Sequence, residues 1–156
     1  MASDFPLFPT AVIGSMPRPQ YVKDLLAART RPGGHSDADL QRRMDDAVRF
    51  VIGLQEQAGI DFVSDGEWRR NSYTRVFTDA VDGFTRDLQP ARKYCTAPQP
   101  ALTSRIKQRR PLSTGDAAFL RANARARSIA TLPSPYSVGA TAWTAEHSSA
   151  LYASRG

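Results

Sequence analysis

Three short polar loops, each following an apolar run, carry the residues of this sequence that are best suited to chemistry. Gly14-Ser15 follows the run Thr10–Ile13, and Asp65-Gly66-Glu67 follows Ile60–Ser64. A third loop, Pro133–Tyr136, follows residues 128–132. Glycine lets a ligand approach the backbone closely, and exposed backbone N–H groups can bind a carboxylate. The carboxylate of Glu67 can in turn pair with an ammonium group.

The second loop also has a simpler interpretation. A Ser-Asp-Gly-Glu stretch after a strand commonly forms a turn followed by a helix cap and binds no ligand. The residue types of this loop, taken alone, leave both interpretations open. Its function therefore depends on what the neighbouring loops contribute.

The segments between these loops alternate between short apolar runs and amphipathic stretches. We expect parallel strands at 11–14, 60–64 and 129–132, because short apolar runs bounded by Gly and Pro are typical of buried strands. Apolar residues recur at helical spacing over 37–58 and 116–127, which predicts two helices on one side of the sheet. This alternation indicates an α/β fold, in which functional loops follow the carboxyl ends of the strands.

The remaining segments are shorter or less regular. We expect helices at Tyr21–Arg29 and Asn71–Val81, and one strand of a hairpin at Leu102–Lys107. Ser36 is a candidate N-cap for the helix over 37–58, and Gly59 is the candidate glycine at its C-terminal end.

Length and composition fit one globular domain over residues 1–156, with 41% hydrophobic and 23% charged residues. No run approaches the roughly 18 apolar residues of a membrane helix, so we expect no membrane partner. The only cysteine, Cys95, cannot form an internal disulfide, which fits a reducing, cytoplasmic setting. The net charge is +6 and its basic excess lies in the second half. Because no zinc finger or RNP motif accompanies it, we expect no nucleic-acid partner.

Three segments resemble motifs of the catalytic barrel of cobalamin-independent methionine synthases, in the order and spacing of that family. They are Phe8–Pro19, Gln55–Arg70 and Thr131–Tyr136. The resemblance implies a TIM (β/α)8 barrel. It implies transfer of a methyl group from 5-methyltetrahydrofolate to the thiol of homocysteine, giving methionine. It also implies a zinc ion that binds this thiol as a thiolate.

The same resemblance implies roles for five residues. The backbone of Ile13, Gly14 and Ser15, together with the carboxylate of Glu67, would hold the amino-acid part of homocysteine. Trp143 is the candidate for a tryptophan that stacks on the folate in this family.

The length of the chain departs from the family. A (β/α)8 barrel takes about 250 residues, so we expect a partial TIM barrel, roughly its first half, in one truncated domain. The family's zinc ligands are a His-x-Cys pair, a glutamate and a second cysteine, all from the later half. This chain offers only His35, His147 and Cys95, which lack that spacing, so we predict no metal site. We therefore expect no activity from the chain alone, and self-association through open sheet edges.

Two alternatives stay open. A related zinc-dependent thiol alkyltransferase with another acceptor, such as coenzyme M, would use the same thiolate chemistry. A non-enzymatic basic module would instead bind an anionic partner through the arginines of the second half. If that partner were a nucleic acid, its binding would weaken steeply as the salt concentration rises.

Overall fold

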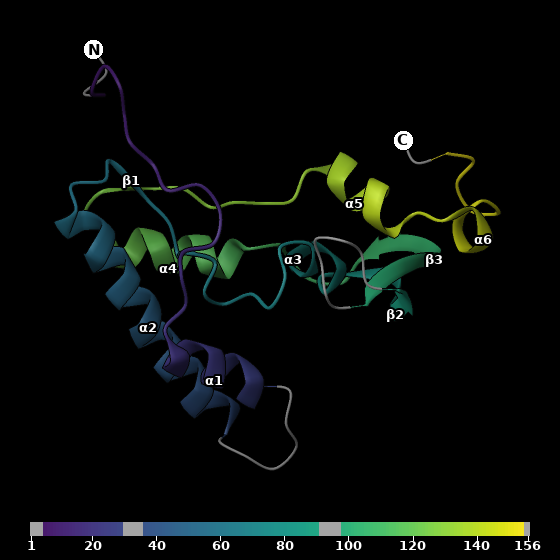
Figure 1. Ribbon diagram of the computed structural model, residues 1–156, viewed down its shortest axis with the longest axis horizontal. Coiled ribbons are helices and arrows are strands. Elements are labelled where there is room, and N and C mark those ends of the chain that lie inside the picture. The colour runs from purple at the N-terminus through teal and green to yellow at the C-terminus, as the bar shows by residue number, and fades with distance from the viewer. Residues whose placement is uncertain (1–4, 30–35, 91–97, 155–156) are drawn as a thin grey trace. The chain divides into compact units, whose positions relative to one another are not determined.

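The computed structural model describes residues 5–29, 36–90 and 98–154. The chain forms two compact units (Figure 1), one made of Met1–Asn71 and Ser113–Thr131 and the other of Ser72–Leu112 and Leu132–Gly156. In the part of the chain that the structure describes, no helix is long and apolar enough to cross a membrane.

The described residues of the first unit form the helices α1 (Gln20–Ala28), α2 (Asp37–Gln57) and α4 (Thr114–Asn123). The expected caps of α2 are confirmed. Ser36 Oγ accepts a hydrogen bond from the backbone N–H of Asp39 (3.2 Å), and Gly59 has the positive φ of 74° that ends many helices. The buried face of α2 joins α1 and α4 in the core, whose buried members are Val22, Leu26, Met44, Ala47, Val48, Val51, Ile52, Val63, Trp68 and Leu120.

A small parallel sheet lies beside these helices. Strand β1 (Phe62–Val63) pairs in parallel with β4 (Arg127–Ser128), and Ala11 forms a parallel bridge to Phe62. The parallel arrangement predicted from the sequence is therefore confirmed. Asp61 holds the segment around Ala11 beside β1. Its Oδ2 accepts hydrogen bonds from the backbone N–H and the hydroxyl of Thr10 at 2.8 and 2.7 Å. Over the described residues this sheet is open and not closed into a barrel.

Several predicted boundaries in this unit were wrong. The strand expected at 11–14 is only an isolated bridge at Ala11, and the strand expected at 60–64 is limited to Phe62–Val63. The strand expected at 129–132 pairs at Arg127–Ser128 instead, and the helix expected to reach residue 127 ends at Asn123. The cause lies on α2, where the carboxylate of Glu56 accepts hydrogen bonds from the backbone N–H groups of Arg125 (2.6 Å) and Ala126 (3.0 Å). These two N–H groups are thus satisfied outside a helix, and the chain extends directly into β4.

The second unit is built on an antiparallel hairpin of β2 (Val81–Gln89) and β3 (Gln99–Gln108). The hairpin strand predicted at Leu102–Lys107 is therefore confirmed. The helix predicted at Asn71–Val81 was wrong in extent, since only α3 (Arg75–Thr78) is helical. Val81 already pairs with Gln108 in the hairpin, which removes the last turn of the expected helix.

Two helices near the C-terminal end cover β3. They are α5 (Pro135–Ala142) and α6 (Ala145–Ser148). The Pro133–Tyr136 segment, predicted as a loop, contains the start of α5. Ser134 caps this helix by accepting a hydrogen bond from the N–H of Ser137 (3.0 Å), and Pro135 occupies the first helical position, where its missing N–H costs nothing.

Candidate functional site

The loop after β1 presents Glu67 in an unusual backbone conformation. Glu67 has a positive φ of 57°, and Gly66 before it has a φ of 61°. The turn is held by Asp65, whose Oδ1 accepts a hydrogen bond from the N–H of Glu67 (2.9 Å). It is also held to α2, because the side-chain amide of Gln55 exchanges hydrogen bonds with the backbone of Ser64. Two consecutive residues in the left-handed region point to a loop that its surroundings fix firmly.

The carboxylate of Glu67 is buried and surrounded by donors from three segments. Glu67 is 4% exposed. Its Oε2 accepts a hydrogen bond from Ser15 Oγ at 2.5 Å, and its Oε1 accepts one from Thr131 Oγ1 at 3.0 Å. The guanidinium of Arg70 lies 3.7 Å from Oε1 and donates to Thr131 Oγ1 at 3.1 Å. The charge of Glu67 is thus compensated within the unit.

Arg18 ties the loop after Ala11 to the loop after β1. Its Nη2 donates to the backbone carbonyl groups of Glu67 (2.7 Å) and Arg70 (2.8 Å). Met16 adds two backbone contacts, since its N–H donates to the carbonyl of Gly66 (3.1 Å) and its own carbonyl accepts from Trp68 Nε1 (3.4 Å). The two loops therefore form one structure around the carboxylate of Glu67.

The structure brings together two of the five predicted site residues, Ser15 and Glu67. Gly14 adjoins Ser15 with a φ of 81°, and a Cβ built there would meet nothing within 4 Å. Ile13 is 94% exposed. The backbone of Ile13–Ser15 therefore runs next to a carboxylate, with open space at Gly14. The binding roles of these residues stay predictions.

Trp143, the fifth residue, belongs to the second unit. Its Nε1 donates to the carbonyl of Tyr152 at 3.1 Å. Its ring lines a largely apolar pocket of about 440 Å³ together with Phe77, Phe84 and Leu102. Aromatic and apolar walls of this kind can accept a flat ring, but the folate role of Trp143 stays a prediction.

Sequence reasoning assigned no role to Arg18, Arg70 or Thr131. All three lie within the segments that carried the resemblance, so a signal was present. Most of their contacts span a long sequence separation: 49 residues from Arg18 to Glu67, 61 from Arg70 to Thr131 and 64 from Thr131 to Glu67. Their partners were therefore not visible in the sequence.

The arrangement around Glu67 can bind a cation. An ionised carboxylate offers about four lone-pair positions, and the hydroxyl groups of Ser15 and Thr131 use one on each oxygen. Ser15 is exposed whereas Thr131 is half-buried, so Oε2 is the oxygen beside the exposed side chain. A ligand ammonium could therefore pair with Glu67 from the side of Ser15.

The residues described do not fit the zinc site of the family. Within the described ranges, no three His, Cys, Asp or Glu side chains are grouped so that they could hold a metal ion. His147 lies in the second unit beside Glu146, with 3.7 Å between Nε2 and Oε2. His35 and Cys95 lie outside the described residues. The absence of a metal site from this chain stays a prediction.

Comparison with known proteins gives consistent matches. Residues 8–123 match the family model described as the cobalamin-independent synthase, catalytic domain. The chain is 32% identical over 139 residues to the methionine synthase of Saccharolobus solfataricus, which covers 87% of the chain and 41% of that relative. It is 31% identical over 138 residues to the methionine synthase of Sulfurisphaera tokodaii, covering 86% of the chain and 40% of the relative.

A solved structure resembles the fold over nearly the whole chain. It is the B12-independent methionine synthase from Shewanella sp. W3-18-1 in complex with selenomethionine, with a TM-score of 0.72 and 28% identity. The match covers 94% of this chain and 42% of that one. The chain thus spans about two fifths of the length of these relatives, and its fold corresponds to part of their barrel.

Proposed function

Because the chain belongs to the cobalamin-independent methionine synthase family, we propose that it supplies the part of a methyltransferase site that holds a thiol-bearing amino acid. In this proposal the carboxylate of Glu67 binds the ammonium group of homocysteine. The backbone N–H groups of the Ile13–Ser15 segment bind its carboxylate.

One observation carries this proposal: the hydrogen bond of 2.5 Å from Ser15 Oγ to Glu67 Oε2. It joins the two motifs that the resemblance assigns to the same substrate, although 52 residues separate them. It also sets an anionic carboxylate beside backbone that can donate hydrogen bonds, which are the two features an amino acid needs. The Shewanella relative was solved with selenomethionine, a ligand that carries the same two charged groups.

The reaction that we propose for the complete site is transfer of a methyl group from 5-methyltetrahydrofolate to homocysteine. Trp143 would stack on the folate. We place residues 1–156 in one barrel domain, because the family match at 8–123 draws on both compact units. With only two histidines and one cysteine, the chain lacks the family's zinc ligands, so we expect no turnover from it alone.

The nature of the acceptor can be tested by binding. L-Homocysteine carries an ammonium group, whereas coenzyme M carries a sulfonate and no amine. A carboxylate at Glu67 attracts the first and repels the second. In titrations of the purified chain followed by NMR, we expect saturable binding of L-homocysteine and much weaker binding of coenzyme M. Equal or tighter binding of coenzyme M would reject Glu67 as an ammonium site.

A further inference from the structure

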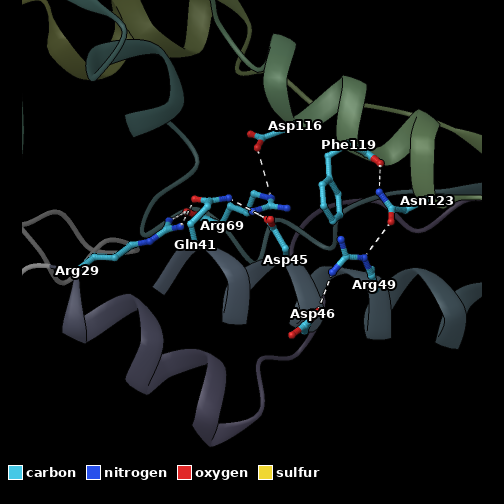
Figure 2. Close-up of polar contacts among 9 residues, drawn as sticks. All are labelled: Arg29, Gln41, Asp45, Asp46, Arg49, Arg69, Asp116, Phe119 and Asn123. Atoms are coloured by element: carbon cyan, nitrogen blue, oxygen red, sulfur yellow. Dashed lines mark hydrogen bonds and ion pairs between the residues drawn. The ribbon is translucent and has the colours of Figure 1, made fainter. Parts of the chain in front are cut away.

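Arg69, two residues after Glu67, sends its side chain into the contact between α2 and α4 (Figure 2). The side chain is 7% exposed. Its Nη1 lies 2.7 Å from Asp45 Oδ1 on α2, and its Nε lies 3.4 Å from Asp116 Oδ1 on α4. The guanidinium also lies over the ring of Phe119, 4.5 Å from the centroid, at a distance typical of a cation–π contact.

The backbone of Arg69 is held as well. Arg29, which follows α1, donates from Nη1 to the carbonyl of Arg69 at 3.3 Å and from Nη2 to Gln41 Oε1 on α2 at 3.2 Å. The residue is therefore fixed to three helices, through its side chain to α2 and α4 and through its carbonyl to the end of α1. None of these contacts involves the carboxylate of Glu67.

The charged groups around Arg69 and Asp116 influence one another. Burial raises the pKa of Asp116, and the nearby carboxylate of Asp65 raises it further. Arg69, Arg70 and Arg29 act in the opposite direction and favour its charged form. Without Arg69, the carboxylate of Asp116 would lose the first of these compensating charges.

We propose that Arg69 is a positioning residue that clamps the loop over 64–70 onto α2 and α4 and so holds Glu67 in its left-handed conformation. A non-glycine residue in that conformation is strained and persists only where its surroundings impose it. Inside the loop, the backbone is joined by two hydrogen bonds of 3.2 Å, from Trp68 N–H to Asp65 O and from Arg70 N–H to Glu67 O. The clamp adds buried ionic contacts directly after Glu67. The effect of these contacts on substrate binding by Glu67 rests on the proposed function.

The first test measures amide hydrogen exchange in the full chain carrying Arg69→Met, which keeps much of the apolar volume and removes the charge. We expect the amides of Met16, Trp68 and Arg70, which make the bonds of the two loops, to exchange about tenfold faster or more through local opening. The amides of Phe62 and Ile129, which pair the sheet of the same unit, should keep their rates.

Arg49→Met is the matched control. Arg49 also lies over Phe119 (5.1 Å), also pairs with an aspartate (Asp46, 2.7 Å) and also links α2 to α4 through Asn123 (2.9 Å). Its polar partners in Figure 2 are Asp46 and Asn123, and neither belongs to the loop over 64–70. We expect its loss to leave the three loop amides unchanged. Equal acceleration in both variants, or acceleration throughout the unit in Arg69→Met, would reduce Arg69 to a general stabiliser and overturn the proposal.

The second test is a double-mutant cycle on L-homocysteine affinity. If Arg69 acts through Glu67, Arg69→Met should weaken binding about fivefold or more in the native background and add less than about twofold in a Glu67→Gln background. If the two substitutions lowered homocysteine affinity additively, Arg69 would not act through Glu67 and the positioning role would be overturned. If the native chain fails to bind homocysteine, the proposed function fails, and the exchange experiment still decides the role of Arg69. Should Arg69→Met not fold, Arg69→Lys, which can keep one ion pair, must show the same localised acceleration.

Discussion

Among the described residues, Ser15 supplies the exposed hydroxyl that donates to the carboxylate of Glu67, and its removal is a mild way to disturb the proposed site. Ser15→Ala should leave the fold intact, because the side chain is exposed. It should weaken L-homocysteine binding by about two- to tenfold, the net contribution of a typical hydrogen bond. The measurement is a titration followed by NMR.

Ser149→Ala is a suitable control for that substitution. Ser149 is also exposed, but its hydroxyl donates to the carbonyl of Ala145 in the second unit. An equal loss of affinity in both variants, or none in Ser15→Ala, would show that the hydroxyl of Ser15 does not orient Glu67.

A second residue, Glu56, makes stability depend on pH. The backbone N–H groups of Ala126 and Arg125 lower the pKa of its carboxyl, with burial acting weakly against them. A pKa that is lower in the folded than in the unfolded chain adds stability above the unfolded value. That stability is lost as the pH falls through the folded value.

We therefore expect Glu56→Gln to lower the melting temperature at pH 7 and to lower it progressively less as the pH falls below about 4.5. Melting curves of both proteins across this pH range give the comparison. A difference that is constant with pH, or that grows in acid, would contradict the role of the charged carboxylate.

Among the elements, the turn after β1 is tightly constrained. Gly66 has a φ of 61°, and a Cβ built there would lie 3.3 Å from Met16 Cβ and 3.3 Å from Trp68 Cδ1. Gly66→Ala should therefore destabilise the chain by about 1–2 kcal/mol, as measured by urea unfolding.

Gly53 provides the opposite case within α2. A Cβ at Gly53 meets nothing within 4 Å, so Gly53→Ala should stabilise the helix by about 0.5–1 kcal/mol. If the two substitutions had similar effects on the free energy of unfolding, the strain assigned to Gly66 would be wrong.

The elements also show what sequence alone could predict. The long helix α2 was found with its caps, because an apolar stripe and local capping residues are properties of adjacent positions. The parallel pairing followed from the alternation of elements. The end of α4 and the register of β4 were missed, because both depend on Glu56, about 70 residues away. The start of the hairpin at Val81 likewise depends on its partner Gln108.

The same distinction applies to the site. The contact between Ser15 and Glu67 could be anticipated, since each residue follows an apolar run and parallel strands bring such loops to one edge. Arg18, Arg70 and Thr131 could not be assigned from type and spacing. An arginine in a polar loop is usually solvated, and only the folded chain shows that these residues contact Glu67 or its loop.

At the scale of the whole molecule, the composition limits the chemistry of the chain. Two histidines and one cysteine without His-x-Cys spacing cannot reproduce the family's ligand set. We expect the purified chain to hold far less than one zinc ion per molecule by elemental analysis. Tight binding of one zinc ion, lost in Cys95→Ser, would contradict this prediction.

The most direct test of the account compares the native chain with Glu67→Gln in titrations with L-homocysteine and with 4-mercaptobutanoate, which lacks the amine. Glutamine keeps the size of the side chain and removes its charge. We expect the native chain to prefer homocysteine. Glu67→Gln should lower homocysteine affinity by about ten- to a hundredfold, while the affinity for the anionic analogue stays the same or rises because a repelling charge is removed. Equal affinities of the native chain for the two ligands, or a preference that survives Glu67→Gln, would contradict the assignment of Glu67 as the ammonium-binding group.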